Sequence, residues 1–220
     1  MAGASLLVDG LEIPAEVHTL DGFRTWRASL GERAPRACFV AGEVHVELSP
    51  QDWRSHLSVA SDLNAQLALL ARRLDVGRYF EQGGWLTNES AALSTEPDGL
   101  LVRWETFAAG EARVDGCELR GRADMVLEVV SRSSERKDTV RLVDAYARAR
   151  VGEYWIVDAR SGPPQVRVLD LSAPSPREVG PDADGFFPSR AWGGSFRLCW
   201  GHDRIGLPTV EVEHRPGPTA

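Results

Sequence analysis

The sequence contains almost no lysine. Lys137 is the only lysine among 25 basic residues, so every other positive side chain is an arginine. The two residues differ chemically, because an ammonium group is a compact charge with a tunable pKa, whereas a guanidinium is planar and stays protonated. A site that requires a small cation beside a phosphate or an attacking water can therefore use lysine. The alternative is that Lys137 is a surface residue without such a role.

Cysteine pairs, long apolar runs and excess positive charge are also missing. Cys38, Cys117 and Cys199 lie far apart with no CxxC pair, which argues against a disulfide framework or a zinc site and favours buried thiols. No apolar run approaches the roughly 20 residues of a membrane helix, and the first residues do not resemble a signal peptide. We therefore expect a cytoplasmic protein. The net charge of -7 counts against nonspecific nucleic-acid binding but does not exclude a nuclease, since carboxylates around a divalent cation contribute to it.

The length and composition predict one globular domain with arms. Of the 220 residues, 43% are hydrophobic and 26% are charged, which suffices for a sizeable core. Residues 1–35 contain an amphipathic stretch from Leu20 to Leu30 and are expected to form an N-terminal arm that packs on the domain. Residues 36–205 are expected to form the domain itself. The proline-containing residues 206–220 are expected to form a flexible C-terminal tail.

Hydrophobic periodicity predicts alternating strands and helices within the domain. The predicted elements are strand 43–48, helix 56–74, strand 123–131, helix 136–150, strand 153–158 and strand 165–171. In the second helix, Val140, Val143, Tyr146 and Ala147 are expected to share one apolar face. A strand, a helix and a strand in this order predict an α/β fold with a mixed or parallel sheet and a right-handed crossover.

Two acids and the single lysine stand at the ends of predicted elements. Asp98 follows Pro97 and opens a strand, Glu128 lies near the end of the buried strand, and Lys137 begins the next helix. Asp124 shares a strand face with Glu128 but lies about 13 Å away, too far for both to bind one ion. We therefore expect the partner of Glu128 to come from a neighbouring strand, with Asp98 as the best-placed candidate.

Two such carboxylates suit Mg²⁺ or Mn²⁺, which take oxygen ligands and keep several waters. The ion would polarise a phosphate oxygen and help generate a nucleophilic water. Lys137 would orient that water or stabilise the charge on the phosphate oxygens. A lysine in the first turn of a helix opposes the helix dipole by roughly 0.3–1 kcal/mol, which favours a functional reason for its position. The alternative is that Glu135 and Asp138 simply offset this effect.

The segments that carry these residues resemble a known family. Residues 122–139 read RADMVLEVVSRSSERKDT, and residues 151–160 read VGEYWIVDAR. Together with the segment LSTEPD at 93–98 and GFFPSR at 185–190, they are similar to the Uma-two family of restriction-endonuclease-like proteins within the PD-(D/E)XK nuclease superfamily. The resemblance covers most of residues 20–200.

The resemblance implies a restriction-endonuclease-like fold, a central mixed sheet flanked by helices, with a Mg²⁺-dependent phosphodiesterase centre. On this basis Asp98 fills the Pro-Asp position and Glu128 the acidic position of the ExK element. The chain departs from the pattern at Val130, where the ExK lysine stands, and at Leu142, where many relatives carry a lysine. Lys137 resembles the lysine of a subgroup with the motif Ser-Ser-x-x-Lys-Asp-Thr and is therefore the candidate amine.

Other residues have two interpretations each. His56, at the start of the first helix, is a third candidate metal ligand, because a helix-borne histidine approaches the metal in related nucleases; the alternative is a helix cap or surface residue. Glu43 and Glu47 are candidate third acids or solvated carboxylates. Tyr146, like Tyr154 and Trp155, is most simply an aromatic that packs against the sheet.

Three classes of function are consistent with these patterns. The first is a metal-dependent endonuclease that hydrolyses DNA phosphodiester bonds, with homodimer formation as an expectation for an enzyme that cuts both strands. The second is a catalytically silent binding or targeting module on the same nuclease-like fold, suggested by the displaced lysine and the negative net charge. The third is an acid/base enzyme acting on small molecules or sugars with paired carboxylates.

Overall fold

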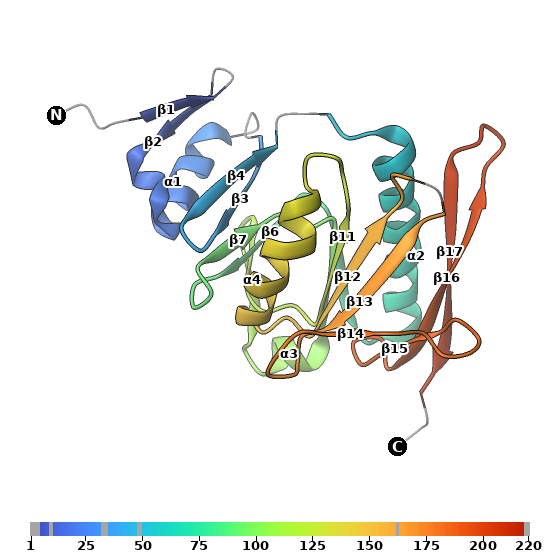
Figure 1. Ribbon diagram of the computed structural model, residues 1–220. Coiled ribbons are helices and arrows are strands. Elements are labelled where there is room, and N and C mark those ends of the chain that lie inside the picture. Colours follow the sequence, from blue (N-terminus) through green and yellow to red (C-terminus); the bar gives the residue numbers. More distant parts are fainter. Residues whose placement is uncertain (1–4, 9–10, 32–34, 48–49, 162, 218–220) are drawn as a thin grey trace.

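The computed structural model describes residues 5–8, 11–31, 35–47, 50–161 and 163–217 (Figure 1). Within these residues the strands form two six-stranded sheets, one three-stranded sheet and one two-stranded hairpin. Of the helices described, none has the length and apolar character that crossing a bilayer requires.

The central sheet contains the predicted strand, helix and strand. Its strand order is β14-β13-β12-β11-β8-β5, and only the β11–β12 pair is parallel among its described pairings. The strands are β5 (Gly77–Glu81), β8 (Gly99–Arg103), β11 (Met125–Val129), β12 (Glu153–Asp158), β13 (Gln165–Asp170) and β14 (Arg177–Val179). Every residue of β11 is buried, as its short, valine-rich apolar run predicts. The predicted mixed sheet is confirmed.

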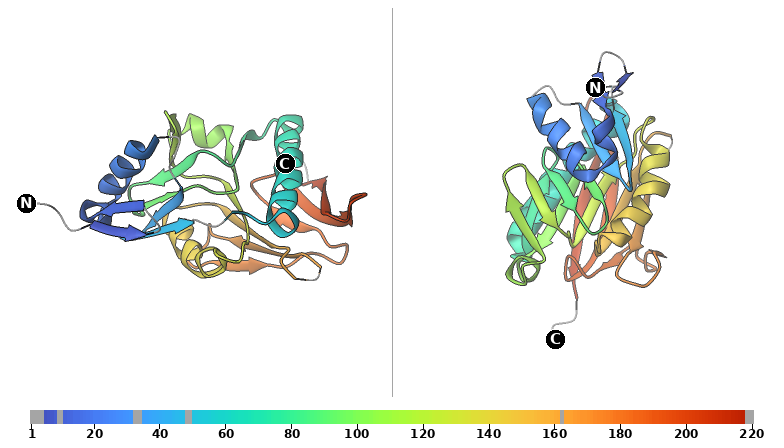
Figure 2. Two further views of the ribbon diagram at one scale, coloured as in Figure 1. Left: turned by 90° about the horizontal axis from the view of Figure 1, so that it is seen from above. Right: turned by 90° about the vertical axis from the view of Figure 1, so that its left-hand side faces the viewer.

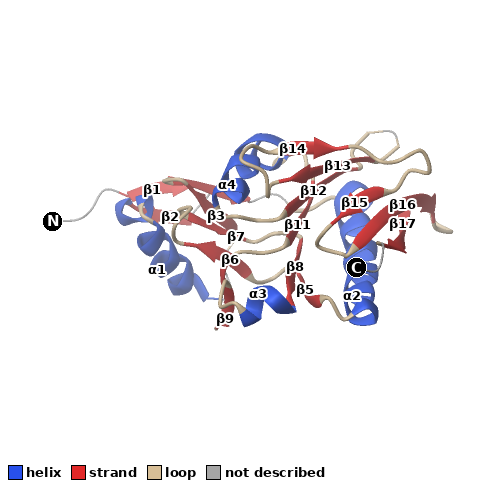
Figure 3. Cartoon of the chain, turned by 90° about the horizontal axis from the view of Figure 1, so that it is seen from below, coloured by secondary structure: helices blue, strands red, loops and turns tan. Residues whose placement is uncertain are grey.

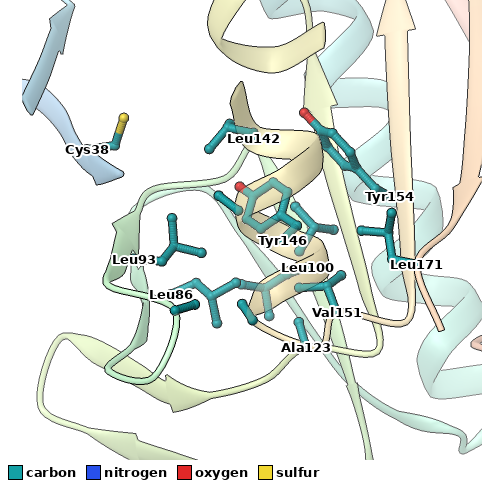
Figure 4. Packing of buried hydrophobic residues seen from close by; sticks show 14 of the residues in the cluster. Cys38, Leu86, Leu93, Leu100, Ala123, Leu142, Tyr146, Val151, Tyr154 and Leu171 are labelled. Atoms are coloured by element: carbon teal, nitrogen blue, oxygen red, sulfur yellow. The ribbon is translucent and has the colours of Figure 1, made fainter. Parts of the chain in front are cut away.

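Helices α2 (Ser58–Leu74) and α4 (Leu142–Arg148) cover opposite faces of this sheet (Figure 2). Successive side chains of a strand point to opposite faces, so β11 contributes to two cores. Leu127 packs in the cluster that contains Leu63 of α2, whereas Val126 packs with Tyr146 of α4. Figure 4 shows Tyr146 inside this second cluster. Glu128 shares the parity of Val126 and is thereby directed to the α4 side.

The second large sheet lies between the central sheet and the N-terminal region (Figure 3). Its order is β4-β3-β7-β6-β10-β9. The strands are β3 (Arg36–Val40), β4 (Glu43–Glu47), β6 (Trp85–Asn88), β7 (Leu93–Thr95), β9 (Ala112–Asp115) and β10 (Glu118–Gly121). Helix α3 (Trp104–Ala108) connects β8 of the central sheet to β9.

The N-terminal region packs on this second sheet through the predicted amphipathic stretch. It consists of β1 (Ser5–Val8), β2 (Leu11–Pro14), a 3-10 turn (Ala15–His18) and α1 (Leu20–Leu30). Phe23 of α1 is fully buried, and its ring centroid lies 5.7 Å from that of Phe39 in β3. The helix therefore contributes to a small core of its own beside the second sheet.

The expectation of a flexible segment from residue 206 onward is wrong for most of that segment. Residues Pro208–Pro216 form β17, which pairs with β16 (Gly194–His202), and β15 (Phe187–Ser189) completes this sheet. The prolines of this segment suggested a loose chain. Two of them, Pro208 and Pro216, lie at the two ends of β17, where a missing N–H is tolerated. Gln66 of α2 accepts a hydrogen bond of 2.7 Å from Val212 N, which fixes β17 on the helix.

The helix predicted at 136–150 begins with a π-helical turn, Lys137–Arg141, before α4. A π-helical turn contains an additional residue and rotates the positions that precede it relative to the helix that follows. Val140 is consequently 57% exposed and, contrary to the prediction, does not share the face of Tyr146, while Leu142 and Tyr146 are fully buried. A second π-helical turn, Trp53–Leu57, precedes α2.

Candidate functional site

Asp98, the residue before β8, lies beside Glu128 of the neighbouring strand β11. The β8–β11 register pairs Gly99 with Leu127, so the next position along the antiparallel pair places Asp98 opposite Glu128. Asp98 Oδ2 accepts a hydrogen bond of 2.8 Å from Val129 N, the residue after Glu128. Both acids are 2% exposed. The structure thus brings together the two acids that sequence spacing placed on neighbouring strands.

Asp98 is held from three sides. Its Oδ1 lies 3.0 Å from Arg36 Nη2 of β3, and its Oδ2 lies 3.2 Å from His56 Nε2. Its main-chain oxygen accepts a hydrogen bond of 3.0 Å from Asn64 Nδ2 of α2. Burial by itself would raise the pKa of Asp98, but the contacts with His56, Arg36 and Val129 N hold the pKa below its ordinary value. Asp98 is therefore an ionised carboxylate in a buried position.

Glu128 has the opposite electrostatic character. Its Oε1 accepts a hydrogen bond of 2.8 Å from Tyr146 Oη of α4. Burial, followed by the negative charges of Asp138 and Asp98, raises the pKa of Glu128 well above its ordinary value. Two neighbouring carboxyl groups with pKa values moved in opposite directions are typical of functional sites.

The amine of Lys137 points toward the carboxyl groups of Glu47 and Asp138, which together with Asp98 and Glu128 form the acid cluster of the site. Its Nζ lies 2.5 Å from Glu47 Oε1 of β4 and 3.4 Å from Asp138 Oδ1, and its side chain is 13% exposed. Burial by itself would lower the pKa of Lys137, but the carboxylates of Glu128, Asp138 and Glu47 raise it above its ordinary value. The amine thus remains a cation enclosed by acids.

Asp138 is an additional buried acid of the site. Burial, together with the charges of Asp98 and Glu47, raises its pKa to about 6 although Lys137 and Ser134 oppose the shift. Among the described residues, its Oδ1 makes no hydrogen bond and faces only the Lys137 ammonium as an ion pair at 3.4 Å. From the sequence, Asp138 was predicted only to offset the unfavourable effect of the helix dipole on Lys137. The sequence shows that Asp138 is a charged residue next to Lys137, but it does not show that Asp138 is buried.

The other sequence candidates are placed as follows. His56 is buried against Asp98 and is not the helix cap, because Asp52 Oδ1 accepts the hydrogen bonds from Arg54 N and Ser55 N. Glu47 is largely buried beside Lys137. Glu43 is exposed and pairs with Arg141, as expected for a solvated carboxylate.

Arg36 and Asn64 were not among the residues predicted from the sequence, and Tyr146 was predicted only to pack against the sheet. Arg36 precedes the buried run of β3, and Asn64 interrupts the apolar face of α2. A polar residue on the buried face of a helix is a usable signal, whereas the contact of Arg36 with Asp98 depends on how the two large sheets meet. Tyr146 gave no signal, because a buried tyrosine in a helix is ordinary.

Asp98 and Glu128 offer carboxylate oxygens, the ligands that Mg²⁺ or Mn²⁺ binds while it keeps several of its waters. Among the described residues, no group of three or more His, Cys, Asp and Glu side chains is arranged to hold a metal ion. A site with two protein carboxylates is compatible with this finding. The raised pKa values of Glu128 and Asp138, caused by burial and by neighbouring carboxylates, indicate crowded negative charge that an added cation would neutralise.

A cavity elsewhere in the described residues does not contain this chemistry. It has a volume of about 550 Å³ and is lined by Asp124 and Glu153, at the opposite end of β11 from Glu128. A much smaller hollow is lined by Arg36, Glu47 and Lys137 and adjoins the acid cluster. The geometry of the titratable groups, and not the cavity size, therefore locates the candidate site.

Comparison with known families places this geometry in context. A family model described as "Putative restriction endonuclease", Uma2, matches residues 20–183. The chain belongs to the Uma2 family. The matched segment includes Asp98, Glu128 and Lys137, and the resemblance found in the sequence is confirmed.

A solved structure shares the fold. The crystal structure titled as a "putative nuclease belonging to DUF820" from Anabaena variabilis superimposes with a TM-score of 0.55 at 17% identity, covering 79% of this chain and 90% of that one. The predicted nuclease-like mixed α/β architecture is thereby confirmed. No curated protein is significantly similar to the chain.

Proposed function

We propose that this Uma2 protein is a metal-dependent endonuclease that hydrolyses DNA phosphodiester bonds. The observation that carries the proposal is Asp98 opposite Glu128 in the β8–β11 register, with the Lys137 amine directed into the same acid cluster. Membership of a family described as restriction endonucleases supports hydrolysis of a nucleic acid.

In this proposal Asp98 and Glu128 hold a Mg²⁺ or Mn²⁺ ion, which would polarise a phosphate oxygen and lower the pKa of a bound water. Asp98 is already ionised, fixed by His56 and Arg36. Glu128 has a raised pKa and must release its proton before its oxygens can act as ligands. Tyr146 keeps the Glu128 carboxyl group in one orientation.

Lys137 acts in this proposal as a fixed positive charge. Because neighbouring carboxylates raise its pKa, the amine stays protonated at neutral pH and does not accept a proton from water. It can still donate hydrogen bonds to a water or to a phosphate oxygen on which negative charge develops. Glu47 and Asp138 hold the amine inside the cluster.

A plasmid-nicking assay tests the proposal. Wild-type protein with Mg²⁺ or Mn²⁺ is expected to convert supercoiled plasmid to open-circular and linear forms, and Glu128→Gln and Asp98→Asn are expected to abolish conversion. The exposed Glu16→Gln is the matched control and should retain wild-type activity. Equal activity in wild type and Glu128→Gln would show that any cleavage comes from elsewhere, and the proposal would fail.

A catalytically silent binding module on the same fold is the second candidate. It is favoured by one observation: protein donors contact both carboxylate oxygens of Asp98, and acids surround the Lys137 amine. Titration calorimetry with Mg²⁺ and Mn²⁺ separates the candidates. Metal binding that disappears in Asp98→Asn and Glu128→Gln supports the enzyme, whereas no binding in wild type supports the module.

A further inference from the structure

Two exposed apolar side chains lie on adjoining segments beside the candidate site. Trp53 is 72% exposed and Ile205 is 73% exposed, more than any other large hydrophobic side chain among the described residues. Trp53 belongs to the π-helical turn before α2, and Ile205 to the tip of the β16–β17 hairpin. Arg54 Nη1 donates a hydrogen bond of 3.2 Å to Gly206 O and joins the two segments. Figure 1 shows the start of α2 and this hairpin tip toward the same end of the molecule.

This end is also that of the acid cluster. Trp53 precedes His56 by three residues in one turn, and His56 Nε2 contacts Asp98. The turn that displays Trp53 thus also carries a side chain in direct contact with Asp98.

Both side chains are displayed by preorganised turns. Asp52 Oδ1 accepts hydrogen bonds from Arg54 N at 3.0 Å and from Ser55 N at 2.7 Å. At the hairpin tip, Asp203 Oδ1 accepts hydrogen bonds from Ile205 N at 2.9 Å and from Leu207 N at 2.8 Å. Fixed turns reduce the ordering cost when the side chains bind a partner.

The charge around this pair suits a polyanion. Arg54, Arg132 and Arg204 are exposed here. Hydrogen bonds from Ser55 lower the pKa of Asp52, and Arg132 lowers it further, which places Arg132 next to the same turn. Asp52 and Asp203 direct carboxylate oxygens to main-chain N–H groups, and Arg54 uses its Nη1 for Gly206 O, so the exposed guanidinium groups of Arg132 and Arg204 and the remaining nitrogens of Arg54 can contact phosphates.

We propose that Trp53 and Ile205 contact the bases of the DNA substrate next to the scissile phosphate, with Trp53 stacking on a base and Ile205 inserted as an apolar wedge. Arg54, Arg132 and Arg204 contact the flanking phosphates. Aromatic side chains stack on bases of any identity, and apolar wedges between base steps unstack a duplex. This inference rests on the proposed nuclease function and adds which residues contact the bases and phosphates of the substrate.

Fluorescence anisotropy with a labelled DNA duplex that carries a single-stranded overhang tests the inference. Binding is measured with Mg²⁺ in a Glu128→Gln background, and plasmid cleavage is measured in the wild-type background. Trp53→Ala is expected to raise Kd about tenfold or more, and Ile205→Ser to raise it several-fold. Trp104→Ala and Leu69→Ala remove exposed apolar side chains elsewhere and should change Kd by less than about twofold.

The outcomes separate this inference from the proposed function. If wild-type protein cleaves plasmid while Trp53→Ala and Trp104→Ala bind the duplex equally well, the contact is overturned and the nuclease stands. If wild-type protein neither binds nor cleaves, both fall. If gel filtration shows a dimer that Trp53→Ala dissociates, with duplex affinity unchanged, the patch is a self-association surface and the inference is overturned. Unchanged thermal unfolding of Trp53→Ala confirms that the variant is folded.

Discussion

Tyr146 Oη donates a hydrogen bond of 2.8 Å to Glu128 Oε1. Glu128 is the last but one residue of β11, and Tyr146 lies on α4, the helix that follows. The connection from strand to helix therefore brings a hydrogen-bond donor back to the acid. The same ring packs edge-on against Tyr154, with ring centroids 4.9 Å apart, which limits its movement. Tyr146 is consequently a positioning residue for Glu128.

Tyr146→Phe should make divalent-metal binding more dependent on high pH. The hydroxyl group lowers the pKa of Glu128, so its removal raises a pKa that is already elevated. The midpoint of Mg²⁺ or Mn²⁺ binding against pH, measured by calorimetry, should move upward, with a stability loss of about 1 kcal/mol. Tyr154→Phe is the matched control, because Tyr154 Oη bonds the main-chain oxygen of Asp138. The same shift in both variants would contradict the assignment.

Lys137→Met should destabilise the protein by about 3–5 kcal/mol at pH 7, because Glu47, Asp138 and Glu128 lose their shared counter-charge. Glu47→Gln in the same chain should restore part of this loss, which urea unfolding of both single variants and the double variant measures. Arg167→Met removes one partner of the exposed Arg167–Glu178 pair and should change stability by less than about 1 kcal/mol. Strict additivity of Lys137→Met and Glu47→Gln would be incompatible with the observed contact.

Asp138→Asn should flatten the pH dependence of stability in metal-free buffer. The pKa of Asp138 is raised from 3.8 to about 6 on folding, so the folded protein binds this proton more tightly than the unfolded chain. The associated stability is fully present below about pH 4 and is lost as pH rises through 6. At pH 7 the variant should exceed wild type by on the order of 2–3 kcal/mol in urea unfolding. Asp144 is exposed, so Asp144→Asn should leave the pH dependence of the unfolding free energy as it is in the wild type. If the unfolding free energies of wild type and Asp138→Asn rise in parallel from pH 4 to pH 7, the expectation is refuted.

Gly99→Ala should destabilise the protein by about 1–3 kcal/mol, because the residue after Asp98 has no room for a side chain. An added Cβ would lie 2.0 Å from Tyr79 Oη and 2.7 Å from Asn64 Oδ1, two atoms joined by a buried hydrogen bond. Tyr79→Phe removes one clash and should restore part of the lost stability in the Gly99→Ala background. Gly180→Ala, where no atom lies within 4 Å of the added Cβ, is the control. Equal thermal stability of Gly99→Ala and Gly180→Ala would contradict the close packing.

Much of the fold and part of the site were predictable from local patterns. The valine-rich run around Glu128 predicted a strand buried on both faces, and the apolar stripe of residues 56–74 predicted the helix that covers one of them. The errors occurred where a local pattern has two physical solutions. Val140 fits a regular helical face but is exposed after a π-helical turn, and Pro208 suggests a loose segment but begins a paired strand.

By itself, the sequence determined the family and the alternation of strands and helices, and it singled out Asp98, Glu128 and Lys137 as candidate site residues, because each depends on short-range order along the chain. Only the tertiary structure decided that Arg36 binds Asp98, that Glu47 binds Lys137, and that Tyr146 binds Glu128. The physical reason is that these contacts join different strands and helices, so they depend on how the two large sheets and α4 pack. The pKa values of the acids depend in turn on that packing, since burial and neighbouring charge exist only in the folded chain.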